Sequence, residues 1–304
     1  MDIEVFTRAN LARYDTVIIS KAFDARARAV AADLRARSRR VIYDICDNYF
    51  IGSVDSPAAN AMSTMLACAT RVVVSTATLR DVIAARTPST TPIAVIGDAI
   101  EVDLGVRTNV FSRRLSQVRL ARLRRSLSGP AGRLVWFGNH SGSGGGGMED
   151  LAARMPDIVA VARRHPASLT VISNSSRKYR DLIRPNAMPT SYLPWHPITF
   201  LEALRAHDVA LIPIRTSEFT RCKSANRPAQ ALACGLAVVA DAIPSYAPFA
   251  SCAEIGADWS SALTSYLRNS ELRRAHVSAA ASVIATTCSP RIIADQWRTL
   301  LEGP

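Results

Sequence analysis

The sequence predicts an α/β protein built from two doubly wound domains in tandem. Short runs rich in Val and Ile alternate with longer Ala-, Leu- and Arg-rich segments of helical period, as is typical of β-α-β units in a parallel sheet. This alternation occurs twice along the chain. The 304 residues, of which 48% are hydrophobic and only 6% aromatic, suffice for two domains whose sheets are covered by Ala-rich helices.

The expected elements follow this pattern in order. In the first half we predict strands at 16–20, 40–43, 71–75 and 93–96, and helices at 22–37, 58–67 and 78–85. In the second half we predict strands at 134–137, 168–173, 191–193, 209–213 and 237–240, and helices at 229–234, 260–268 and 271–286. A last helix should begin after Ser289, an N-cap followed by Pro290 at the first helical position.

The domain boundary falls in an arginine-rich stretch. Residues 1–105 form the predicted N-terminal domain, 106–132 a basic linker and 133–286 the C-terminal domain, with a final helix at 287–304 that would cross back to the N-terminal domain. The N-terminal domain is abbreviated, with about four recognisable strands. Tandem domains of this type face a cleft, and ligands bind beyond the carboxyl ends of parallel strands.

Composition narrows the function classes. The net charge is +12, but lysine occurs only at Lys21, Lys178 and Lys223, so the excess is arginine and has a compositional explanation. We therefore expect no nucleic-acid partner.

The six cysteines are scattered, without metal-binding spacing. No apolar run approaches the roughly 18 residues of a membrane span, and the N-terminal residues lack an export-signal pattern. The expected location is the cytoplasm.

A glycine-rich loop is the first candidate site. Gly138, Asn139 and His140 follow a predicted strand, and further glycines lead into a helix near Met148. Backbone N–H groups at a helix N-terminus bind phosphate. The loop lacks the Gly-Lys-Ser/Thr of a Walker loop, and its alternative interpretation is a flexible surface loop.

A second candidate lies between a predicted strand and a predicted helix. Lys223, Ser224, Asn226 and Arg227 precede the Ala-rich run at 229–234. Lys223 and Arg227 are four residues apart, so on a first helical turn they would share a face beside the positive end of the helix dipole. Two cations crowded there are unfavourable unless an anion lies between them.

The stretch from Leu134 to Gly256 resembles the GT-B glycosyltransferases of the retaining group 1, also called family 4. The matching segments, in order, are 136–139 (WFGN), 173–174 (SN), 192–195 (YLPW), 208–213 (DVALIP), 223–227 (KSANR) and 231–240 (ALACGLAVVA). The resemblance implies a GT-B fold of two Rossmann-like domains, and a sugar transferase with an acceptor-side N-terminal domain and a C-terminal domain that binds a nucleotide sugar.

The resemblance also implies roles for single residues. Gly138 and Asn139 would lie under the donor pyrophosphate, and His140 beside them. Ser173 and Asn174 would line the donor pocket, Trp195 would face the base, and Lys223 and Arg227 would neutralise the diphosphate. Cations and N–H groups can stabilise this leaving group without a metal. We therefore expect no metal and no cofactor besides the nucleotide-diphosphate sugar, which is the donor substrate.

Two positions depart from the family pattern. Gln230 and Cys222 stand where the family commonly carries glutamates. Gln230 can still hydrogen-bond a donor hydroxyl. The N-terminal half has no histidine, so Asp47, with Asp44, is the nearest acidic candidate to assist proton removal from the acceptor. A turn or cap residue is the alternative interpretation of these aspartates.

The sequence leaves alternatives open. The leading interpretation is an enzyme whose acceptor is a glycan, a lipid-linked sugar or a small molecule, as in bacterial polysaccharide biosynthesis. The second is a non-catalytic accessory protein that only binds nucleotide sugars, which the thin N-terminal half and the two missing glutamates motivate, and the third is a sugar-nucleotide epimerase of the same fold. The arginines from Arg113 to Arg125, interleaved with Leu and Val, form either a solvated connector helix or a basic amphipathic helix on the inner face of a membrane. The oligomeric state is not determined by the sequence.

Overall fold

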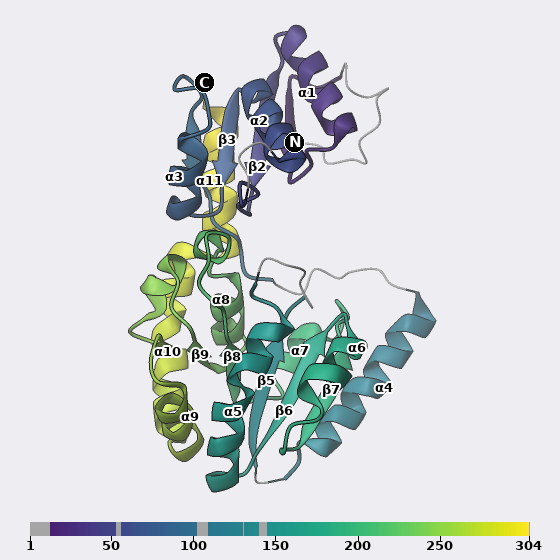
Figure 1. Cartoon of the computed structure of the whole chain (residues 1–304), viewed down its shortest axis with the longest axis vertical. Helices are drawn as coiled ribbons and strands as arrows, with labels where there is room; N and C mark the ends of the chain where they lie inside the picture. The colour runs from purple at the N-terminus through teal and green to yellow at the C-terminus, as the bar shows by residue number, and fades with distance from the viewer. Residues whose placement is uncertain (1–12, 53–55, 102–108, 130, 140–144, 304) are drawn as a thin grey trace. The chain divides into compact units, whose positions relative to one another are not determined.

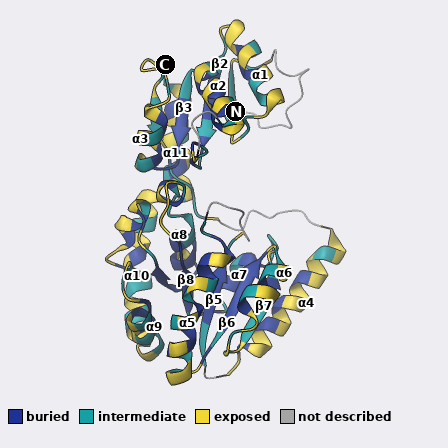
Figure 2. Cartoon of the chain, viewed as in Figure 1, coloured by how far each residue is buried: buried dark blue, intermediate teal, exposed yellow. Residues whose placement is uncertain are grey.

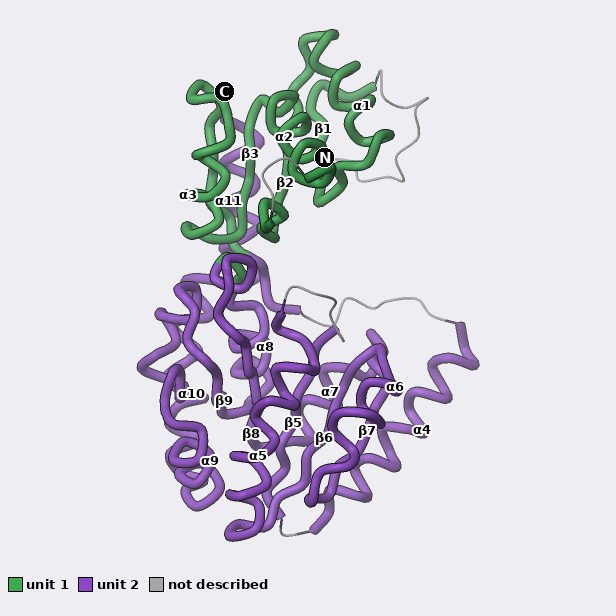
Figure 3. Tube along the Cα trace, viewed as in Figure 1, with its two compact units in different colours: residues 1–97, 222–224 green, residues 98–221, 225–304 purple. Residues whose placement is uncertain are grey.

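The computed structural model describes residues 13–52, 56–101, 109–129, 131–139 and 145–303 (Figure 1). The chain divides into two compact units (Figure 3). Unit 1 comprises residues 1–97 and the short segment Cys222–Ser224. Unit 2 comprises residues 98–221 and 225–304. Each unit contains its own parallel sheet.

Unit 1 is a four-stranded parallel sheet with the order β1-β2-β3-β4. Its strands are β1 (Thr16–Ser20), β2 (Arg40–Ile45), β3 (Arg71–Val74) and β4 (Ile93–Val95), and its helices are α1 (Ala25–Ala36), α2 (Pro57–Cys68) and α3 (Ala77–Ala84). Each helix begins at a side-chain cap: Asp24, Ser56 and Thr76 accept a hydrogen bond from the backbone three residues on. The central strands β2 and β3 are mostly buried, as their Val and Ile runs predict, whereas the edge strands β1 and β4 are partly exposed.

Unit 2 is a six-stranded parallel sheet with the order β10-β9-β8-β5-β6-β7. The strands are β5 (Gly132–Phe137), β6 (Ala167–Ser173), β7 (Thr190–Pro194), β8 (Val209–Ile212), β9 (Ala237–Ala240) and β10 (Glu254–Ile255). From β5 the chain adds β6 and β7 on one side, then returns to place β8 on the other side of β5. The carboxyl ends of β5 and β8 therefore flank a topological switch point, where doubly wound sheets bind ligands.

Helices cover both faces of the unit 2 sheet. The longer ones are α4 (Val110–Ser126), α5 (Met148–Arg164), α8 (Asn226–Ala233), α9 (Trp259–Arg268) and α10 (Ser270–Thr287). Helix α11 (Pro290–Glu302) follows α10 and packs against it. Shorter elements are α6 (Ser176–Lys178), the π-helical segment η2 (Tyr179–Ile183), α7 (Phe200–Leu204) and the 3₁₀ segments η3 (Thr220–Cys222) and η4 (Pro244–Phe249). Alternate residues of β5 enter different cores: Trp136 packs in the core with α5 and α9, and Phe137 in the core with α7 and α8.

The sequence predicts most of these elements. The bounds of β1 and β9 agree with the expected ranges, and α10 and α11 begin within one residue of theirs. The two-residue strand β10 and the segment η2 were not predicted. The arginine-rich stretch forms α4, which packs on β7 within unit 2. The six cysteines form no disulfide within the part of the chain that the structure describes.

One helical stretch of the described residues, 270–302, is long and apolar enough to count as a candidate membrane span. Cys288 and Ser289 divide it into α10 and α11. Because α10 also packs against α8 and α9 of unit 2, it serves as a covering helix of that unit.

Candidate functional site

The polar and glycine residues of unit 2 gather at the carboxyl edge of its sheet. The loop from Gly138 follows β5, Asn174 follows β6, Trp195 follows β7 and Asp241 follows β9. The loop from Ile214 follows β8 and leads to α8. The loops after β5 and β8 flank the switch point, so the site predicted from the sequence lies where the topology places a ligand.

Two glycines of the first loop adopt a backbone conformation that other residues rarely reach. Gly145 and Gly146 have φ of 88° and 76°. They deliver the chain to Gly147, the N-cap of α5, which has no side chain to accept a hydrogen bond from the first helical turn. The positive end of α5 is therefore presented at the carboxyl edge of the sheet without a side-chain cap.

Helix α8 begins in the same way. Its N-cap is Ala225, which also provides no side-chain hydrogen bond. Among the described helices of eight residues or more, α5 and α8 are the two that begin without a side-chain cap. Both begin in loops that flank the switch point. Two helix N-termini with uncapped first turns favour an anion there.

The guanidinium of Arg227, on the first turn of α8, lies between the two ends of the glycine-rich loop. A Cβ added to Gly138 would lie 3.5 Å from Arg227 Nη1, and one added to Gly146 would lie 3.2 Å from Nη2. The first distance is an ordinary contact and the second is a tight one, so Gly146 is the glycine that leaves room for the guanidinium. The glycine-rich loop and Arg227 therefore lie together at this edge of the sheet.

Arg227 Nη1 is buried and has no hydrogen-bond partner among the described residues. A buried donor without a partner costs about 1–3 kcal/mol, and more when it is charged. The other buried side-chain atom in this condition is Nε1 of Trp136, whose ring lies 3.3 Å from the position of a Gly138 Cβ. The unsatisfied donors of the described chain thus lie against the same glycine. An anion with several acceptor oxygens would satisfy Arg227.

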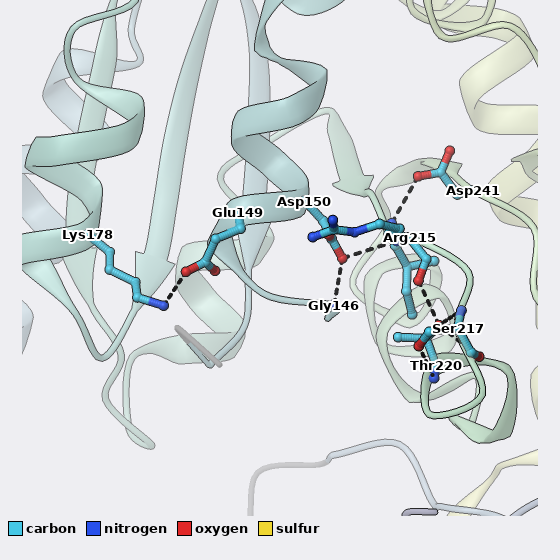
Figure 4. A network of polar contacts seen from close by, with 9 residues as sticks. Gly146, Glu149, Asp150, Lys178, Arg215, Ser217, Thr220 and Asp241 are labelled. Carbon is cyan, nitrogen blue, oxygen red and sulfur yellow. Dashed lines mark hydrogen bonds and ion pairs between the residues drawn. The ribbon is translucent and has the colours of Figure 1, made fainter. Parts of the chain in front are cut away.

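Two carboxylates hold the loops after β5, β8 and β9 in place (Figure 4). Asp150, 4% exposed on the first turn of α5, accepts hydrogen bonds from the backbone N of Gly146 at 2.5 Å and of Arg215 at 3.1 Å. Asp241 accepts from the backbone N of Ile214 at 2.9 Å and from Arg154 and Trp259. Asp150 therefore ties the glycine-rich loop to the loop after β8, beside Arg227.

Neither carboxylate was predicted as part of the site. Asp150 had a usable signal in the sequence, since it is an acid placed one turn after a glycine run. Asp241 had none beyond its position after a strand. Within the loop after β8, the Thr220 hydroxyl donates to the Arg215 carbonyl at 2.7 Å and accepts from Ser217 N at 2.8 Å. These hydrogen bonds close the loop on itself.

The residues predicted to line the donor pocket lie together beyond β5, β6 and β7. Asn174 Nδ2 donates to Asn139 Oδ1 at 3.0 Å. The backbone carbonyl of Ser173 accepts from Trp195 N at 3.0 Å, which fixes the start of the Trp195 loop. Trp195 is 48% exposed, beside Phe200 at 6.2 Å between ring centroids. A half-exposed ring at this edge offers a surface for a base. His140 lies outside the described residues.

The expected crowding of Lys223 and Arg227 on one helical turn was wrong. Lys223 precedes the N-cap of α8 and belongs to unit 1, where its Nζ donates to Asp47 Oδ1 at 2.7 Å. The 3₁₀ segment η3 turns the chain before α8 begins. Of these two cations, Arg227 is the one whose buried nitrogen lacks a partner among the described residues, whereas Lys223 pairs with the Asp47 carboxylate.

Asp47 follows β2 at the carboxyl edge of the unit 1 sheet. Cys46 Sγ contacts its Oδ2 at 3.5 Å. Burial, and after it the negative charge of Asp47, raise the pKa of the Cys46 thiol to about 11. Cys46 therefore stays a protonated thiol at neutral pH and can donate to Asp47. Asp44 accepts from the hydroxyl of Ser20 at 2.7 Å, an internal contact of the sheet.

The remaining predicted contacts differ in their surroundings. Asn226 is the first residue of α8 and is half-buried, while Ser224 belongs to unit 1. Gln230 is 2% exposed, and its amide is engaged by the backbone of Glu101: Oε1 accepts from Glu101 N at 2.5 Å and Nε2 donates to Glu101 O at 3.3 Å. A contact between Gln230 and the donor stays a prediction. It would require the Gln230 amide to break its hydrogen bonds to the Glu101 backbone and form new ones to the donor.

Comparison with known proteins shows the fold of the chain. No protein-family model and no curated protein sequence matches it. A trehalose-6-phosphate structure from E. coli bound with UDP-2-fluoro glucose aligns with a TM-score of 0.66 and 14% identity over 95% of this chain and 73% of that one. The UDP-forming trehalose-phosphate synthase from Burkholderia xenovorans aligns with a TM-score of 0.66 and 13% identity, over 98% of this chain and 80% of that one. WaaG, a glycosyltransferase involved in lipopolysaccharide biosynthesis, aligns with a TM-score of 0.61 and 15% identity, over 90% of this chain and 81% of that one.

These similarities confirm the fold predicted from the sequence. The chain has the GT-B fold, with a Rossmann-like parallel sheet in each of its two units.

Proposed function

We propose that the chain is a glycosyltransferase that moves a sugar from a nucleotide-diphosphate sugar to a glycan, lipid-linked or small-molecule acceptor. The observation that carries the proposal is Arg227, whose buried Nη1 lies near Gly138 and lacks a hydrogen-bond partner among the described residues, and whose Nη2 lies near Gly146. Two helix N-termini without side-chain caps lie at the same edge. A diphosphate has the charge and acceptor oxygens that this arrangement lacks. The fold shared with a protein that holds a UDP-sugar supports the same ligand class.

The donor contacts follow from the positions of the residues. The diphosphate would bind Arg227 and the amides around Gly138, Gly146 and the start of α8. Asn139, His140, Ser173 and Asn174 would contact the donor beyond β5 and β6, and Trp195 would face the base. Lys223, Ser224, Asn226 and Gln230 complete the proposed set through their place in the sequence resemblance.

The proposed reaction breaks the bond between the anomeric carbon and the diphosphate oxygen. Negative charge grows on the departing diphosphate, and Arg227 with the backbone N–H groups would stabilise it, which is why we propose transfer without a metal. An acceptor hydroxyl forms the new bond to the anomeric carbon and releases its proton, for which Asp47 is the proposed base. We propose that the anomeric configuration is retained.

A nucleotide screen tests the donor site first. The chain is melted in the presence of UDP, GDP, ADP, CMP and dTDP and their sugar derivatives. At a hundredfold excess over the dissociation constant, a ligand of the native state adds about 3 kcal/mol to the unfolding free energy, so one nucleotide class should raise the melting temperature clearly. No shift with any of them would contradict the proposed site.

A non-catalytic accessory role is the second candidate. The unit 1 sheet has four strands among the described residues, and Gln230 is occupied by the Glu101 backbone where the family commonly has a glutamate. An accessory protein would bind the nucleotide sugar without turnover. Incubation of the stabilising donor with acceptor panels, followed by detection of released nucleoside diphosphate, separates the two roles.

We further propose that the chain acts in the cytoplasm of a bacterium, in the assembly of a polysaccharide, without binding nucleic acid. The acceptor class decides between a soluble location and the inner face of a membrane. A product analysis with lipid-linked and soluble acceptors distinguishes them.

A further inference from the structure

Helix α4 exposes apolar side chains on the face that points away from its own sheet. Ser116, Leu120 and Leu123 are its buried residues, and the helix packs on β7 (Figure 1). On the opposite face, Phe111, Leu115 and Val118 follow one another at helical spacing and are 78%, 39% and 47% exposed. Val110, 68% exposed, lies at the same end of the helix.

This concentration sets α4 apart from the rest of the described chain. Eight large hydrophobic residues of that part are exposed, and Val110, Phe111, Leu115 and Val118 account for four of them. Most of α4 is coloured as exposed in Figure 2. Scattered exposed apolar residues are ordinary in soluble proteins, but a run along one helix face indicates an interaction surface.

The same helix is strongly basic. Val110–Ser126 contains six arginines and no acidic residue. All six arginines are exposed. Arg124 forms an ion pair with Glu202 at 2.9 Å. By helical spacing Arg114, Arg122 and Arg125 lie on the outward face with Phe111 and Val118, so apolar and cationic groups alternate along one surface.

We propose that the outward face of α4 docks on an anionic lipid bilayer. Arginine side chains extend their apolar stems along such a surface while their guanidinium groups reach lipid phosphates, and Phe111, Leu115 and Val118 enter the headgroup boundary between them. A purely polyanionic partner would match the arginines but would leave Phe111 in water. The combination of charge and exposed apolar area therefore selects a bilayer.

The N-terminal end of α4 lies at the carboxyl edge of the unit 2 sheet. Ser112 Oγ and His196 Nε2 are 3.0 Å apart, which joins the first turn of α4 to the loop of Trp195. Docking through Phe111 brings this edge of the sheet to the bilayer surface. The docking does not depend on sugar transfer, so it holds for an enzyme and for an accessory protein alike.

Vesicle sedimentation tests the proposal with the full chain. The chain should bind vesicles of phosphatidylcholine mixed with phosphatidylglycerol, and should not bind phosphatidylcholine alone. Each basic residue at an anionic membrane surface strengthens binding about fivefold, so Arg114→Gln with Arg122→Gln should weaken it about 25-fold. Phe111→Ala with Leu115→Ala should weaken it about tenfold or more, because the apolar contact is lost.

The matched control is Arg163→Gln with Arg164→Gln. These exposed arginines on the last turn of α5 belong to the same unit, so the control removes equal charge from another helix. It should change vesicle binding less than twofold, by long-range attraction alone. Glutamine keeps a high helix propensity, and circular dichroism melting verifies that each variant is folded.

Equal losses in the α4 and α5 variants would mean that only net charge attracts the chain, and would overturn the proposal. So would equal binding to neutral and anionic vesicles. Binding to single-stranded nucleic acid that depends on Arg114 and Arg122, without vesicle binding, would assign α4 to a different partner.

Discussion

The carboxyl edges of the two sheets differ in how their polar groups are satisfied. In unit 1 each of the three helices begins at a side-chain cap, and Asp47 and Lys223 match one another's charge. In unit 2 the helices α5 and α8 begin without such caps, and Arg227 Nη1 has no partner among the described residues. Among the described residues, the buried cationic nitrogen without a partner therefore lies at the edge of unit 2.

This difference indicates which of the two edges would gain more free energy from binding a charged ligand. A donor or cation that is buried without a partner destabilises the free protein, and the ligand that satisfies it gains that energy on binding. The unit 2 edge is therefore the stronger candidate for tight binding of a charged group. Asp47 of unit 1 stays the proposed base for the acceptor.

Replacement of Arg227 should have the largest effect. Arg227→Met removes the charge that faces the diphosphate, so the affinity for a nucleoside diphosphate should fall about 100-fold, in line with the 2–5 kcal/mol of a buried charge contact. The melting temperature without ligand should not fall, because a buried donor without a partner is removed. Calorimetric titration and thermal melting measure the two effects.

Arg164→Met is the control for Arg227→Met. It removes an exposed arginine from the last turn of α5, away from the carboxyl edge of the sheet. It should leave the affinity within twofold. A lower melting temperature of the ligand-free Arg227→Met chain would show that Arg227 is satisfied internally and would remove the contrast between the two units.

Filling the space beside Arg227 with a methyl group should have the second-largest effect. In Gly146→Ala the new methyl group meets Arg227 Nη2 at 3.2 Å, and the φ of 76° is strained for alanine. We expect the affinity for the nucleoside diphosphate to fall about tenfold and the stability to fall by about 1 kcal/mol.

Gly235→Ala separates the two causes, because Gly235 has a φ of 86° but no atom within 4 Å of the added Cβ. It should lose similar stability and keep its affinity, as titration and urea unfolding can measure. Equal loss of affinity in both variants would attribute the effect to strain rather than to the arginine.

Asp150→Asn should weaken the link between the loops after β5 and β8. The backbone N–H groups of Gly146 and Arg215 donate to the same carboxylate oxygen, Oδ2. An asparagine oxygen there is an uncharged and weaker acceptor, and its NH₂ group replaces the Oδ1 that faces Arg215 Nη2. We expect a loss of about 1–3 kcal/mol in stability and a severalfold loss of nucleotide affinity. Hydrogen exchange at the Gly146 and Arg215 amides should rise. Unchanged exchange at both amides would show that Asp150 does not hold the loops.

The smallest effect is expected for Lys223. Its ammonium and the Asp47 carboxylate are 31% and 22% exposed, and such a pair contributes about 0–1 kcal/mol to stability. Lys223→Met should reduce nucleotide affinity less than Arg227→Met does, by a fewfold. A loss as large as that of Arg227 would place both cations on the diphosphate and would end the contrast between the two edges.

The fold could be predicted because parallel strands buried on both faces appear as continuous Val and Ile runs. Residues 237–240 illustrate this, since they are fully buried and were located with their observed bounds. The edge strand 16–20 was also located with its observed bounds, although it is only partly buried. The strand Glu254–Ile255 could not be located, because two residues are too few to show the hydrophobic pattern of a strand.

The site was predictable in its location and only partly in its contacts. Gly138, Asn139 and Arg227 were identified because loops after parallel strands meet at one edge. The placement of Lys223 depended on where α8 begins, which the turn of η3 decides and which a helical spacing rule cannot see. Asp150 was missed because its partners, the N–H groups of Gly146 and Arg215, are backbone groups from two loops that only the fold brings together.

A crystal structure of the chain with the nucleoside diphosphate that stabilises it most tests the central claim directly. The account predicts diphosphate oxygens within hydrogen-bond distance of Arg227 Nη1 and of the first-turn amides of α5 or α8. A nucleotide bound elsewhere, with Arg227 Nη1 still lacking a partner, would contradict it.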